Sequence, residues 1–163
     1  MPIKAYAGAS PEPAKETREL QMKHNVMLTI ASLLSILFMT FHLADDIVRG
    51  VEQGGTSNLL LVPILAIWLY GTLALAERRS GYVITLLGSL LGAFVPVIHF
   101  MSAGGVAGGE IAKSSGAFFF VWTLIALGVA AVFSFILSAR GLWNAIRARS
   151  RKSDNPNSEG PAA

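Results

Sequence analysis

The side chains that could do chemistry gather in two stretches of this sequence. His42, Asp45 and Asp46 follow i, i+3, i+4 spacing, so a helix would place them on one face. His99 and Glu110 come much later in the chain. Imidazole and carboxylate groups suit zinc, iron, copper or manganese. The pattern predicts a candidate metal site made from these five residues.

The two histidines occupy matching places in the apolar segments that contain them. His42 lies near the end of segment 26–44, and His99 lies near the end of segment 82–101. If both segments cross a membrane, the two side chains lie at similar depth and could converge. One histidine from each of two facing helices is also the ligand set of a b-type haem. The sequence therefore leaves a transition metal and a haem open as cofactors of His42 and His99.

A simpler interpretation of these polar residues also stands. The pattern His-x-x-Asp-Asp is not a specific motif, and polar side chains at a membrane boundary can reach water. Asp45 could pair with Arg49 at i+4 spacing. The sequence alone does not separate a boundary cluster from a ligand site.

Several other chemistries are excluded more firmly. The chain has no cysteine, which excludes disulfides, thiolate metal ligands and cysteine nucleophiles. Segment 109–114 lacks the glycine directly before lysine that a phosphate loop needs, and no Gly-x-Ser-x-Gly elbow is present. The apolar segments contain no Asp, Glu, Lys or Arg, so a single chain has no charged relay for ions.

Four apolar segments must position these residues. Hydrophobic residues make up 53% of the 163 residues, charged residues make up 14%, and the mean hydropathy is +0.55. The apolar residues concentrate in segments 26–44, 58–76, 82–101 and 116–139. Each approaches the roughly 20 residues that span a bilayer as a helix. We expect an all-α fold, an integral membrane antiparallel four-helix bundle with four transmembrane helices.

The polar remainder predicts how the chain is organised around those helices. We expect a transmembrane domain over 14–149, with disordered cytoplasmic tails at 1–13 and 150–163. Charged residues over 12–24 favour a short helical extension of the first span. The link 77–81 predicts a tight turn, and the two other connections are longer and rich in glycine.

The basic residues predict the orientation. Eleven of the 13 Lys and Arg residues lie before residue 26, in the link 77–81 or after residue 139; the exceptions are Arg49 and Lys113. Basic residues resist translocation, so this side is expected to be cytoplasmic, with both termini on it, in a bacterial plasma (inner) membrane. The isoelectric point near 9.5 then reflects topology, and no nucleic-acid partner is expected.

Small residues predict close helix contacts in the third segment. Gly88 and Gly92 have small-xxx-small spacing, which lets two helix backbones approach in a membrane. The pair could serve a contact inside one bundle or a face for dimerisation. Trp68 and Tyr70, near the middle of the second segment, could be packing residues or could line a ligand pocket.

These patterns support three functional hypotheses. The leading one is a small multi-pass, non-enzymatic accessory or assembly subunit that acts through helix contacts, with the lipid bilayer, a homo-oligomer or a membrane complex as its partners. The alternative is a metal- or haem-binding membrane protein with a site at the outer face made by His42, Asp46 and His99. The third is transport of a small or apolar solute by an oligomer.

Overall fold

The computed structural model describes residues 12–48, 59–101 and 116–154. Within these ranges the chain is all-helical and has no strand. The helices are α1 (Glu12–Val48), α2 (Leu61–Leu73), α3 (Arg79–Met101) and α4 (Ala117–Asp154). The predicted outer loops and the outermost parts of both tails lie outside the described residues.

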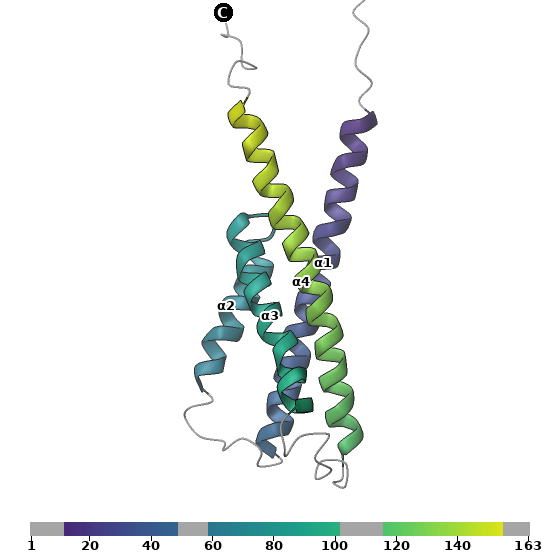
Figure 1. Ribbon diagram of the computed structural model, residues 1–163, viewed down its shortest axis with the longest axis vertical. Coiled ribbons are helices and arrows are strands. Elements are labelled where there is room, and N and C mark those ends of the chain that lie inside the picture. Colours follow the sequence, from purple (N-terminus) through teal and green to yellow (C-terminus); the bar gives the residue numbers. More distant parts are fainter. Residues whose placement is uncertain (1–11, 49–58, 102–115, 155–163) are drawn as a thin grey trace, which may run out of the picture.

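The helices alternate in direction along the bundle (Figure 1). The start of α1, the α2–α3 turn and the end of α4 all lie toward one end of the molecule. The most extensive helix contacts are those of α4 with α3 and with α1, while α2 packs mainly against α3. Three long helices therefore form the main body, and the shorter α2 flanks it.

Three of the helices are long and apolar enough to cross a membrane, which is consistent with a membrane protein. These are α1, α3 and α4. The segment expected to span over 58–76 forms the shorter α2, whose 13 residues extend about 20 Å at about 1.5 Å per residue. The described helix is thus shorter than a hydrocarbon core of about 30 Å.

The link between α2 and α3 is a tight turn, as the sequence predicted, but it begins earlier. α2 ends at Leu73, and Arg78 N–H donates to the Leu75 carbonyl at 3.0 Å. Glu77 takes a positive φ of 70°, which reverses the chain direction. The turn uses residues that we had placed in the second span, and this shortens α2.

The first and last helices, α1 and α4, extend beyond the apolar segments that predicted them. The expected helical extension before the first span is confirmed, because α1 begins at Glu12. α4 continues to Asp154, beyond the boundary at residue 150 where we expected the disordered tail to begin. Arginine, lysine and alanine all favour helix in water, so the α4 helix does not have to stop where its apolar segment stops.

Polar side chains fill much of the interior, and large apolar side chains cover the surface. The buried polar residues among those described are Asn25, Ser32, Ser35, His42, Asp46, Thr72, Thr85, Ser89, Thr123, Ser134 and Ser138. Many leucine, isoleucine, valine and phenylalanine side chains on all four helices are exposed. Small polar residues between helices and apolar residues outside them are typical of membrane bundles.

The glycine pair of α3 makes its contact inside the chain. A Cβ atom added at Gly88 would lie 2.6 Å from Cε2 of Trp68, and one added at Gly92 would lie 3.3 Å from Cη2 of the same indole. Trp68 Nε1 donates to Ser32 Oγ at 2.9 Å, and Ser32 Oγ lies 2.7 Å from Thr72 Oγ1. Gly88 and Gly92 thus make room for the buried Trp68, which links α2 to both α1 and α3.

Candidate metal centre

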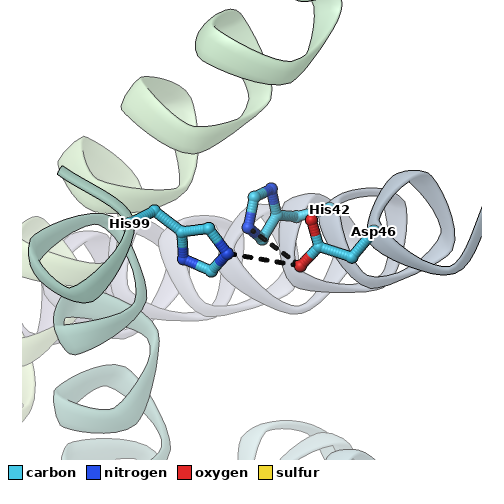
Figure 2. A group of neighbouring side chains, drawn as sticks. All are labelled: His42, Asp46 and His99. Carbon is cyan, nitrogen blue, oxygen red and sulfur yellow. Dashed lines mark ion pairs between the residues drawn. The ribbon is translucent and has the colours of Figure 1, made fainter. Parts of the chain in front are cut away.

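Two helices bring three of the expected ligands together. His42 and Asp46 lie one turn apart on α1, and His99 lies near the end of α3. Because α1 and α3 run in the same direction, these residues meet at the end of the bundle opposite the start of α1 and the end of α4 (Figure 1). Figure 2 shows both imidazole rings approaching one carboxylate oxygen of Asp46.

The distances in this group suit a single metal ion. Asp46 Oδ2 lies 3.5 Å from His42 Nε2 and 3.4 Å from His99 Nε2. One ligand atom from each of the three residues lies within 4.8 Å of the others. A tetrahedral metal with bonds of about 2.0–2.1 Å separates neighbouring ligand atoms by about 3.3 Å. Small rotations of these side chains would therefore bring all three ligand atoms to bonding distance of one metal ion.

The hydrogen bond of His99 fixes its ring in a ligand-ready form. His99 Nδ1 lies 2.9 Å from the Val95 carbonyl oxygen, one turn earlier on α3. A carbonyl can only accept, so Nδ1 carries the proton and donates it. In that tautomer the lone pair of the ring lies on Nε2, which is the atom that faces Asp46. A metal-binding histidine commonly has this second hydrogen bond.

The group is enclosed. His42 is 2% exposed and Asp46 is 4% exposed, while His99 is partly buried. Neither ring nitrogen of His42 has a hydrogen-bond partner among the described residues. Buried polar atoms are usually paired, so the two ring nitrogens of His42 are available to a further partner such as an ion or a ligand.

Phe120 of α4 closes the third side of the site. Its ring centroid lies 5.0 Å from that of His42 and 5.8 Å from that of His99, and the side chain is fully buried. This residue was missed from the sequence. Its only signal is the run of phenylalanines at 118–120, which does not by itself show which ring faces inward.

One of the other two expected ligands, Asp45, is not part of this group. Asp45 lies on α1 beside Asp46 but is not among the three residues whose ligand atoms converge. Adjacent residues on a helix point about 100° apart, so only one of the pair can face α3. Glu110 lies outside the described residues.

The arrangement does not fit a haem held by both histidines. A porphyrin ligated on both faces would have to lie between the two imidazole rings. The centroids of these rings are 4.7 Å apart in an edge-to-face contact, with an angle of 79° between their planes. Rings in direct contact leave no gap for a macrocycle, so the site suits a single ion.

Comparison with known proteins does not assign a family or a function to this chain. No protein-family profile, curated protein sequence or solved structure matches the chain significantly. The functional conclusion therefore rests on the site and on the helices that form it.

Proposed function

We propose that this chain is an integral membrane protein that binds one transition-metal ion through His42, Asp46 and His99. The observation that carries the proposal is the convergence of two imidazoles and one carboxylate, from two helices, in an enclosed place. Ionisable residues in membrane segments are costly and are retained for function. A bound cation would also compensate the carboxylate charge of Asp46.

The apolar surface supports insertion into a bilayer. Exposed large apolar residues occur on all four helices, far beyond the isolated patches found on soluble monomers. In this arrangement α2, together with residues that flank it, makes the fourth crossing. The basic tails and the α2–α3 turn face the cytoplasm, and the metal site lies near the opposite face of a bacterial plasma membrane.

The ligand set narrows the choice of metal. Two histidines and one carboxylate with positions left open are typical of non-haem Fe(II) sites and of catalytic zinc sites. Magnesium and calcium prefer oxygen ligands, and Cu(I) prefers sulfur. We therefore infer that iron or zinc is the occupant, with open positions that can take a further ligand.

Elemental analysis of the purified protein tests this proposal. The protein should be isolated in detergent through a tag without histidines, and it should carry about one iron or zinc per chain. Asp46→Asn keeps an oxygen but removes the charge, so we expect metal affinity to fall about tenfold or more. Asp45→Asn is the matched control, because it removes a neighbouring carboxylate that is not in the converging group, and it should lower affinity much less than Asp46→Asn. Metal-free wild-type protein that stays metal-free after incubation with both ions would overturn the proposal.

A role as an accessory subunit remains a second proposal, supported by a different surface. A groove of about 510 Å³ runs between α1 and α4; large apolar side chains make up most of its lining, and Ala31, Ala126 and Ala130 complete it. Small residues on a lipid-facing surface permit close approach of another helix. If a second copy or a partner packs there, Ala130→Leu should lower the cross-linked oligomer fraction, whereas Ala66→Leu on α2 should not. An unchanged oligomer in Ala130→Leu would argue against this surface.

A further inference from the structure

A large cavity adjoins the His42, Asp46 and His99 group, and Phe120 is not among the described residues that line it. Its volume is about 450 Å³, and residues of α1, α2 and α3 line it. His42, Asp46 and His99 contribute its polar groups. Its apolar walls include Met39, Leu65, Trp68, Leu91, Phe94 and Ile98. An apolar pocket of this size with a few convergent polar groups is typical of small-molecule sites.

We propose that this cavity binds a membrane-soluble quinone, with a ring oxygen directed at the His42, Asp46 and His99 group. The inference deepens the proposed function and rests on it in one respect, because the oxygen takes an open coordination position of the metal. The neutral apolar ring then occupies the space between Trp68 and the metal site. Binding alone is inferred, and no electron transfer is part of the inference.

The side chains that line the cavity favour a neutral, mostly apolar ligand. Its lining includes the carboxylate of Asp46, and no Lys or Arg occurs among the described residues that line it. A phosphate or a fatty-acid carboxylate would therefore meet no Lys or Arg among these residues, and the proposed metal would be the one positive charge that could bind it. A carbonyl oxygen carries no net charge, yet it can coordinate a metal or accept a hydrogen bond from an imidazole.

The aromatic residues of the cavity suit a flat ring. Trp68 is 2% exposed, and its indole is held by the hydrogen bond to Ser32 and by its contact with Gly88. Phe94 contributes a second aromatic side chain to the lining. Aromatic rings favour stacked or edge-to-face contacts with other rings, and the Phe94 side chain, which is 55% exposed, can offer such a contact to a flat ligand.

The opening of the cavity suits a ligand that arrives from lipid. Leu61, Ile64, Phe94 and Ile98 line the cavity and are also exposed on the apolar outside of the bundle. The cavity is thus continuous with the surface that faces the hydrocarbon in the proposed membrane orientation. A quinone dissolved in the bilayer could enter without crossing water.

Quenching of Trp68 fluorescence tests the inference. The reporter protein carries Trp122→Phe and Trp143→Phe, which leaves Trp68 as its one tryptophan of the three in the chain. Titration with a benzoquinone bearing a decyl tail should quench Trp68 saturably. Adding Ile64→Phe fills the cavity and should weaken binding about tenfold. Adding Ile67→Phe makes the same change three residues away, at a residue outside the cavity lining, and should leave binding unchanged.

The outcomes separate this inference from the metal proposal. Quenching that does not saturate, or that is equal in the Ile64→Phe and Ile67→Phe proteins, shows partitioning into detergent only and overturns the quinone site even if the metal is present. Removing the metal with a chelator should weaken quinone binding about tenfold. Specific quenching in protein that never binds metal would instead overturn the metal proposal and the coordination step, while supporting the cavity as a quinone site.

Discussion

His42→Ala and His99→Ala are each expected to lower metal affinity by more than about 100-fold. Loss of a residue that merely orients a ligand typically costs 10–100-fold in affinity, so loss of a ligand should cost at least as much as the upper end of that range. Each substitution leaves one imidazole and Asp46, too few protein ligands to hold Zn²⁺ or Fe²⁺ tightly. Competition with a chromophoric chelator measures the change directly.

The third histidine provides the matched control. His24 lies on α1 toward the other end of the bundle and is not part of the converging group. His24→Ala should therefore retain wild-type metal affinity and stoichiometry. The proposal fails if all three alanine variants bind metal equally well, because the metal then binds elsewhere. Size-exclusion profiles of the variants would show whether each remains a folded particle in detergent.

Trp68→Ala is expected to lower the free energy of unfolding by about 3–5 kcal/mol. The indole is buried between α2 and α3, donates to Ser32 of α1, and fills the space left by Gly88. Its removal leaves a void and a broken hydrogen bond where three helices meet. Dispersion contacts are lost in a membrane as they are in water, so the cost does not depend on the hydrophobic effect alone. Reversible unfolding in mixed detergent micelles measures the change.

Trp122→Ala makes the same chemical change at the surface of α4. Trp122 is 55% exposed, so its replacement should shift the free energy of unfolding by less than about 1 kcal/mol. Gly88→Ala should fall between the two variants at about 1–3 kcal/mol, since its new methyl group meets the Trp68 ring. Equal stability of the Trp68→Ala and Trp122→Ala proteins would contradict the central role of Trp68.

Trp68 connects the stability of the bundle with the candidate ligand site. The residue is fixed by Ser32 and Gly88 on one side and lines the cavity on the other. The sequence offered packing and pocket lining as alternatives for this residue. In the structure it does both, because a side chain that is held rigidly by neighbouring helices can also form the wall of a site.

Much of the helical architecture could be predicted from the sequence. Long charge-free apolar segments predict helices, because hydrocarbon cannot hydrogen-bond to the backbone and a helix satisfies its backbone groups internally. Four helices form at the four expected places. Helix ends were predicted less well, as α2 and α4 show. Hydropathy locates the apolar part of a helix, but the hydrogen bonds of a turn or a soluble extension decide where the helix ends.

The spacing of His42, Asp45 and Asp46 determined that these residues share one region of α1, because helical periodicity is a local property. Which carboxylate faces His99, and that the two imidazoles touch each other and Phe120, were decided only by the packing of α1, α3 and α4. The same packing turned Gly88 inward to Trp68. Sequence spacing fixes which residues lie on one helix face, but the rotation of each helix about its axis depends on all of its neighbours at once, and that rotation places the ligands.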